Sequence, residues 1–214
     1  MAEQGKVVGG PRARYREQVR AEVQAHAWEQ IADAGASALS LKAIAMTMGI
    51  TAPALYRYFA GRDELLTDLI LEAYRDLAEV VEAASAVDEK PQHTLRAIAT
   101  ALRRWATAHP QRYLLLYGTP VPGYSAPPEA AALATRIFAP LLTAFAAADR
   151  ERTGRGATGP TGRRTAAALL RSTTFWTRLH GVLSLELAGH FDGMNVDAEL
   201  LYDQEASSAI SLDG

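Results

Sequence analysis

The stretch that most constrains the fold of this chain is residues 40–66, SLKAIAMTMGITAPALYRYFAGRDELL. Ser40 offers a hydroxyl to the free amides of a first helical turn, which predicts a helix start there. Four apolar residues then fall at the spacing i, i+3, i+4 and i+7 and predict one buried face: Leu41, Ile44, Ala45 and Met48. Gly49 stands where a helix end favours positive φ, so this short helix is expected to stop there.

A second short helix is predicted directly after this glycine. Thr51 is expected to cap it, and Pro53 is tolerated in its first turn because no intrahelical donor is lost there. Leu55 and Phe59, four residues apart, are expected to turn inward. Small, aromatic and basic residues remain outside: Thr51, Ala52, Pro53, Tyr56, Arg57 and Tyr58. With a third helix opening near Arg62, this order is typical of a helix-turn-helix DNA reader.

Residues from about 15 to 77 resemble the DNA-binding domain of the TetR family of transcriptional regulators. The resemblance rests on residues that follow in register without a gap: Leu39, Ile44, Ala45, Met48, Gly49, Pro53, Ala54, Leu55, Tyr56, Tyr58, Phe59, Arg62, Glu64, Leu65 and Leu66. It implies that DNA is contacted from the two short helices and from the start of the third.

The resemblance also implies a role for each contact residue. Ser40 and Lys42 would lie against the DNA, Thr51, Ala52, Pro53 and Arg57 would face bases, and Tyr56, Tyr58 and Arg62 would hold the backbone. Base contacts set sequence preference, whereas phosphate contacts set register and salt dependence. The alternative for Tyr56 and Tyr58 is packing against the third helix, and Arg57 stays open between base and phosphate.

The fold class predicted for the whole chain is all-α, because no stretch shows the two-residue alternation of a strand. We expect a helix-turn-helix domain over residues 1–62 and a larger helical ligand-sensing and dimerisation domain over residues 63–214. Four arginines before and within the first predicted helix, residues 14–34, form a basic arm: Arg12, Arg14, Arg16 and Arg20. Such an arm either reaches toward DNA or stays hydrated.

Further helices are predicted over residues 62–84, 91–109, 112–117, 128–148, 163–188 and 197–212. The first of these links the DNA reader to the rest of the chain and is expected to transmit a signal. Residues 149–162, rich in glycine and charge, are expected to form a mobile linker.

Near the C-terminus, Trp176, His180 and Gly181 form the pattern WxxxHG. This pattern resembles the WHG domain found in part of the TetR family, and the resemblance implies an all-helical domain for ligand sensing and dimerisation. The helix that carries it is apolar nearly all round, so we expect it to be buried on two sides. A homodimer through the last two helices would cover the second side.

A ligand pocket is predicted where aromatic residues of several helices should face one another: Trp105, Tyr113, Tyr117, Phe138, Phe145, Trp176 and His180. Such a pocket would suit a small hydrophobic or aromatic effector. The alternative is that these residues are ordinary core, because aromatic stripes at helical spacing usually pack together. His180 has the matching alternative of a hydrogen-bonded buried histidine.

Composition and motifs narrow the function classes. The chain has no cysteine and a formal charge of −2, which removes disulfides and thiol redox sensing and argues against indiscriminate nucleic-acid binding. Without a signal peptide or a membrane-spanning run, a cytoplasmic location and no membrane partner are expected. No catalytic motif is present, and Glu186 with His190 offers only two ligands, so we expect no enzyme, cofactor or metal.

Together these features predict a ligand-responsive repressor that binds a palindromic operator as a homodimer and is released by a small molecule. Two recognition helices would read half-sites roughly 34 to 36 Å apart. The alternatives are a dimeric regulator or activator without a small-molecule inducer, and a small-molecule binding protein with a relic DNA-binding head.

Overall fold

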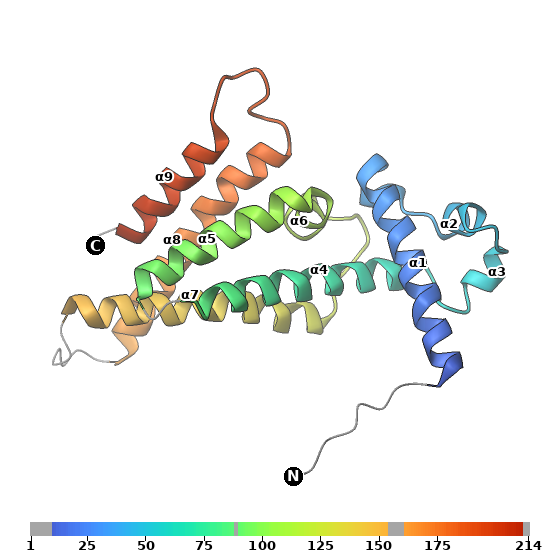
Figure 1. The fold of residues 1–214 in the computed structure, drawn as a ribbon, viewed down its shortest axis with the longest axis horizontal. Helices are drawn as coiled ribbons and strands as arrows, with labels where there is room; N and C mark the ends of the chain where they lie inside the picture. Colours follow the sequence, from blue (N-terminus) through green and yellow to red (C-terminus); the bar gives the residue numbers. More distant parts are fainter. Residues whose placement is uncertain (1–9, 88–89, 154–160, 212–214) are drawn as a thin grey trace, which may run out of the picture. The chain divides into compact units, whose positions relative to one another are not determined.

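The computed structural model describes residues 10–87, 90–153 and 161–211, and every regular element in them is helical (Figure 1). The fold class is therefore all-α, as predicted. The helices are α1 (Pro11–Ala34), the 3₁₀ turn η1 (Ala36–Ala38), α2 (Leu41–Thr47), α3 (Ala52–Leu55), α4 (Arg62–Ser85), α5 (Pro91–Ala108), α6 (Pro110–Tyr117), α7 (Pro128–Thr153), α8 (Thr161–Leu187) and α9 (Ala198–Ser211).

Two compact units divide the chain. The first holds Met1–Leu69 together with Val121–Ser125, and the second holds Ile70–Pro120 and Ala126–Gly214. Helix α4 thus begins in the first unit and ends in the second. The chain returns to the first unit between α6 and α7, where the Tyr124 hydroxyl lies 3.0 Å from Thr67 Oγ1. The predicted domain boundary after residue 62 stays a prediction.

The core of the first unit forms where the sequence periodicity predicts it. Helix α1 buries one stripe at four-residue spacing, and α2 and α3 bury their predicted inward faces: Val19, Val23, Ala27, Ile31, Leu41, Ile44, Ala45, Leu55 and Phe59. Ser40 Oγ accepts a hydrogen bond from Ala43 N at 3.3 Å, which confirms the predicted cap of α2. Gly49 has a φ of 67°, the left-handed conformation that ends this helix.

One local prediction in this unit is wrong, and one turn was not predicted. The Thr51 side chain makes no capping hydrogen bond to α3; its backbone carbonyl accepts one from Ala54 N at 2.9 Å instead. The α-helical part of the second short helix ends at Leu55, because the bonds that follow from Arg57 N and Tyr58 N span only three residues. The chain therefore leaves α3 through a turn that is tighter than an α-helix.

The core of the second unit joins the later part of α4 to α5–α9. Its fully buried residues include Leu77, Leu102, Tyr113, Phe145 and Tyr202. The Tyr202 hydroxyl donates to the Ala99 carbonyl at 2.8 Å and so fixes α9 to α5. Helices α8 and α9 lie side by side in this unit (Figure 1).

Helix α7 extends beyond its predicted end at residue 148. It continues to Thr153, so residues 149–153 of the predicted linker are helical, because Asp149 is held there by Arg171 at 2.5 Å. Residues 154–160 of that linker lie outside the described residues.

A segment of α7, Pro128–Arg152, is long and apolar enough to cross a membrane, although no membrane-spanning run is expected from the sequence. This is weak evidence, since core helices pass the same test and α7 supplies Ile137, Leu141 and Phe145 to the core.

Arg20 was predicted to belong to a basic arm that reaches toward DNA or stays hydrated, but its side chain is bonded within the first unit. Helix α1 begins at Pro11, so all four arginines of the arm are helical. The Arg20 guanidinium donates to the Tyr58 carbonyl at 2.6 Å and to Asp68, and it lies 4.1 Å from the centre of the Phe59 ring. Arg20 therefore connects α1 to α4 and to the turn after α3.

We predict that Arg20→Ala destabilises the first unit by about 2 kcal/mol, the usual loss for charge-assisted hydrogen bonds at a partly exposed site. Urea unfolding followed by the fluorescence of Trp28, with Trp105 and Trp176 replaced by Phe, measures it. The matched control is Arg16→Ala, an exposed arginine of the same helix, which should stay within about 0.5 kcal/mol of the parent. Equal stability of the two variants would contradict the role given to Arg20.

Candidate nucleic-acid interface and effector cavity

The residues predicted to contact DNA are arranged on α2, α3 and the adjoining turns. Lys42, Thr51, Pro53, Tyr56 and Arg57 are exposed, and Tyr56 keeps half of its surface open to solvent. The half-buried members of the set are Ser40, Ala52, Tyr58 and Arg62. Apolar anchors at Leu55 and Phe59 hold α3 from beneath, so its small N-terminal residues stay accessible for close approach.

Arg62 already has partners within the first unit. Its guanidinium donates to the carbonyls of Ala36 at 3.0 Å and Ser37 at 3.4 Å, and it lies 3.7 Å from the Asp63 carboxylate. It therefore closes the η1 turn against the start of α4. Its predicted phosphate contact stays a prediction and would have to share or replace these bonds.

Five of the seven residues predicted to form the ligand pocket come together in the second unit. Ring centres are separated by 5.3 Å for Tyr113 and Tyr117, 4.4 Å for Tyr117 and His180, and 4.1 Å for Trp176 and His180. Phe138 meets the edge of Trp176 at 6.2 Å. Helices α6, α7 and α8 thus build one aromatic cluster, which we define as Tyr113, Tyr117, Phe138, Trp176 and His180.

A cavity of about 370 Å³ opens beside this cluster. Its lining is almost entirely apolar: Tyr117, Ala134, Thr135, Ile137, Phe138, Ala139, Leu142 and Trp176. A mostly apolar cavity of this size suits a small organic molecule.

His180 supplies the polar part of the cluster. Its Nδ1 lies 2.9 Å from the Tyr113 hydroxyl, which in turn lies 3.0 Å from Ser184 Oγ. Its Nε2 is buried and has no hydrogen-bond partner among the described residues. Burial lowers the pKa of His180 to about 4, so the imidazole is neutral at pH 7. The cluster therefore carries an uncharged buried nitrogen that no described residue hydrogen-bonds.

The other two predicted pocket residues lie elsewhere. Trp105 donates from Nε1 to Asp76 at 2.9 Å and lines a separate groove between α4 and α5. Phe145 is fully buried against Phe175, with ring centres 5.6 Å apart, and behaves as ordinary core. Equal helical spacing does not distinguish a residue at a cavity wall from one inside the core.

A polar network on α4 was not visible in the sequence motifs. Arg112 on α6 donates to Glu72 at 2.8 Å and to Asp76 at 3.0 Å. Asp76 also receives the Trp105 bond from α5. The signal that could have found it is the four-residue spacing of Asp68, Glu72 and Asp76, which places three carboxylates along one line of α4.

Charged partners also account for Glu186, which the sequence offered as half of a two-ligand metal site. Both of its oxygens accept from Arg103, at 2.6 and 2.9 Å. In the part of the chain that the structure describes, no group of three His, Cys, Asp or Glu residues is arranged to hold a metal.

Several apolar side chains remain exposed on the last two helices. Leu170 on α8 is 68% exposed and Leu200 on α9 is 55% exposed, with Leu169 and Leu185 also open to solvent. A Cβ added at Gly181 would meet nothing within 4 Å. Clustered exposed leucines on packed helices are typical of an interaction surface.

Comparison with known protein families matches both ends of the chain. Residues 25–69 match the family model of bacterial regulatory proteins of the tetR family, and residues 95–208 match the tetracyclin repressor-like C-terminal domain. The HTH-type transcriptional regulator Rv1816 of Mycobacterium tuberculosis is 45% identical over 141 residues, which cover 64% of this chain and 60% of that protein. The matched part thus spans less than two thirds of this relative.

Solved structures agree with this match. The crystal structure of SCO4313, which is described as a regulatory protein, is 50% identical, covers 95% of this chain and all of that one, and gives a TM-score of 0.82. AibR, whose structure contains isovaleryl coenzyme A and operator DNA, shares the fold at a TM-score of 0.61 over 90% of this chain and 96% of AibR, with 18% identity.

The low pKa of His180 predicts a specific pH dependence of stability. In the folded chain His180 stays neutral down to about pH 4, whereas in the unfolded chain it takes up a proton near pH 6.5, so the folded state loses stability as pH falls through this window. Between pH 7.5 and 5.0 this loss amounts to about 2 kcal/mol.

Urea denaturation of the parent, His180→Gln and His190→Gln at the two pH values tests this dependence. His190 is exposed, so its variant should keep the full loss of the parent, whereas His180→Gln should lack about 2 kcal/mol of it. The same loss in all three proteins would show that His180 is not the buried neutral group described above.

Proposed function

Because the chain belongs to the TetR family of transcriptional regulators, we propose that it is a homodimeric repressor that binds a palindromic operator and is released by a small hydrophobic or aromatic molecule. It would act in the cytoplasm, where its DNA lies. The observation that carries this proposal is the exposed N-terminal end of α3, held on buried Leu55 and Phe59 and surrounded by Lys42, Tyr56 and Arg57.

The chemistry of this surface supports sequence-specific reading. Small residues at Ala52 and Pro53 allow the backbone to approach base edges, and Arg57 extends beside them as a charged donor. Lys42 and Tyr56 offer exposed groups for phosphates at the flanks. A net charge of −2 means that this local arrangement, not the charge of the whole chain, has to attract DNA.

The exposed leucines of α8 and α9 support the homodimer. A twofold interface would cover Leu170 and Leu200, and the open space at Gly181 would let the partner helix approach closely. Two reading heads in one dimer then require two half-sites related by twofold symmetry, which is the reason for a palindromic operator.

The aromatic cluster and its cavity support a small-molecule effector. A ligand would pack against Phe138 and Trp176. The Nε2 of His180, which has no hydrogen-bond partner among the described residues, lies in the same cluster. The operator DNA and isovaleryl coenzyme A bound to AibR show that one protein of this fold takes both kinds of partner.

Two connections can carry the effect of a ligand to the reading head. Helix α4 is held by Arg112 of α6 and continues into the first unit. The segment after Tyr117 also enters that unit, where Tyr124 contacts Thr67. A ligand shifts operator binding only by its different affinity for the bound and released arrangements of the dimer.

The test is selection of genomic DNA fragments by the purified protein, followed by footprinting of the best fragment. We predict a palindromic footprint that Arg57→Ala weakens by about tenfold or more. If Arg57 faces a base, its loss relaxes sequence preference at one position of each half-site. If it faces a phosphate, its loss weakens binding to all sequences. The slope of log affinity against log salt concentration then becomes shallower by about one.

Tyr56→Phe should weaken binding a few-fold, because it removes one hydroxyl but keeps the ring. The control is Arg75→Ala, an exposed arginine of α4 in the second unit, which should bind as the parent does. No specific footprint at low salt, or a footprint that is indifferent to Arg57, would contradict the proposed reading surface.

A further inference from the structure

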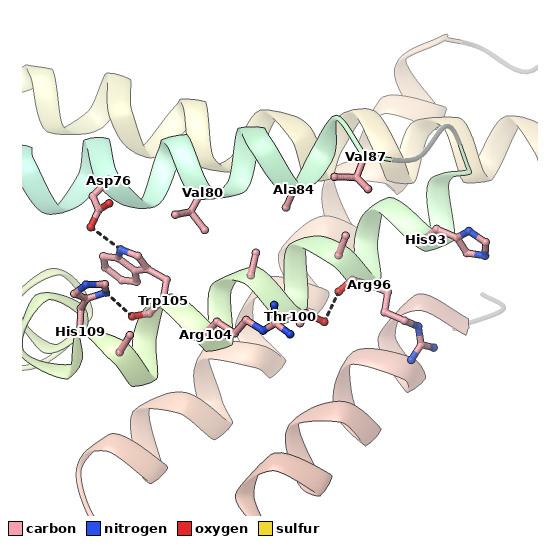
Figure 2. Close-up of a pocket in the computed structure, with 13 residues that line it drawn as sticks. Asp76, Val80, Ala84, Val87, His93, Arg96, Thr100, Arg104, Trp105 and His109 are labelled. Atoms are coloured by element: carbon pink, nitrogen blue, oxygen red, sulfur yellow. Dashed lines mark hydrogen bonds between the residues drawn. The ribbon is translucent and has the colours of Figure 1, made fainter.

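A second and larger cavity lies in the same unit, away from the aromatic cluster. It is a groove of about 700 Å³ between α4 and α5, and it shares no lining residue with the cavity beside Trp176 (Figure 2). At one end of this groove, Asp76 accepts hydrogen bonds from Trp105 and Arg112. The proposed regulator function gives the rest of the groove no role.

The wall of the groove is apolar along most of its length. Val80 and Ala84 line it from α4, Val87 lines it from the turn after α4, and Ala97, Ala101 and Trp105 line it from α5. Figure 2 shows the α4 side chains facing those of α5 across this space. Val87 is 77% exposed, so the groove is open to solvent along an apolar wall. Burying this wall under an apolar molecule is favourable.

One side of the groove carries uncompensated positive charge. Arg96 and Arg104 on α5 are exposed, and neither has an ion pair or a side-chain hydrogen bond among the described residues. Among the described residues of the lining, Asp76 is the only one with a carboxylate, and it already accepts bonds from Trp105 and Arg112. The described lining therefore favours an anion at its α5 side.

The spacing of the two arginines sets the size of a matching ligand. They are eight residues apart, which is roughly 12 Å along a helix, with Thr100 between them on the same side. Figure 2 shows Thr100 between Arg96 and Arg104 along α5. A short linear molecule that lies along the wall would thus have its charged end close to the guanidinium of Arg96 or of Arg104.

We propose that the groove between α4 and α5 is a second ligand site, which binds a medium-chain amphipathic carboxylate with its apolar chain on the Val80, Ala84 and Ala101 wall and its carboxylate on Arg96 or Arg104. Arginine suits this role because its planar guanidinium pairs with both oxygens of a carboxylate. The proposal does not depend on the effector cavity or on operator binding.

Isothermal titration of the full chain with decanoate, below its micelle concentration and without DNA, tests the site. We expect saturable binding that weakens as salt is raised, because part of the affinity comes from partly exposed charges. Decanol, which has the same chain but no charge, should bind at least tenfold more weakly. Absence of saturable decanoate binding, or equal binding of decanol, would overturn the proposal.

Variants locate the ligand. Replacing both arginines, Arg96→Gln and Arg104→Gln, should weaken decanoate binding at least tenfold. The control is Arg75→Gln, an exposed arginine of α4 that does not line the groove, and it should leave decanoate binding within twofold. Trp176→Phe, which alters only the aromatic cavity, should also leave it within twofold.

Two further readouts separate this proposal from the proposed function. Circular dichroism should show unchanged helix content in each arginine variant, since these exposed side chains make no ion pair or side-chain hydrogen bond among the described residues. The operator footprints of these variants should match that of the parent. If Trp176→Phe abolishes decanoate binding while the arginine double variant keeps it, the carboxylate lies in the aromatic cavity and the groove is not a ligand site. If the parent gives no specific operator footprint, the regulator proposal is overturned, whereas the proposal of a ligand site in the groove is unaffected.

Discussion

The rest of the structure depends on the apolar stripe of helix α4, because this one helix belongs to both compact units. Its buried residues recur every three or four positions from the first unit into the second: Leu65, Leu66, Leu69, Ile70, Ala73, Leu77, Ala78 and Val81. Each unit needs part of this stripe to complete its core. A change in how α4 packs in one unit therefore has a direct physical route into the other.

The polar side of α4 adds a second constraint of the same kind. Three acids at four-residue spacing each pair with an arginine: Asp68 with Arg20 of α1, and Glu72 and Asp76 with Arg112 of α6. The first pair belongs to the reading head and the other two belong to the unit that holds both cavities. The proposed ligand sensing and DNA binding would thus act on neighbouring turns of one helix.

Much of the fold followed from the sequence because its determinants are local. The Ser40 cap, the positive φ of Gly49 and the inward faces of α1 and α2 depend on residues within one or two turns. Local sequence patterns are therefore enough to predict them. The end of α7 did not follow, because it is held by Arg171 of α8, which lies 22 positions from Asp149.

The site was predicted less completely than the fold, for the same reason. Aromatic residues at helical spacing predicted a pocket, and five of them meet, but Trp105 and Phe145 face other neighbours that only the packing of whole helices decides. The partners of Arg20 and Arg62 also come from distant segments. The roles of the DNA-facing residues and of the effector stay predictions that solution experiments have to decide.

The most direct test of the central claim is the distance between the two reading heads of a dimer. The chain has no cysteine, so a single one introduced at the exposed Ala32 of α1 can carry a spin label in each subunit. On a selected operator fragment, pulsed electron resonance should give one narrow distance between labels, and an effector that releases the DNA should shift it. Absence of coupling between the labels on the operator, or one unchanged distance in the released state, would contradict the account.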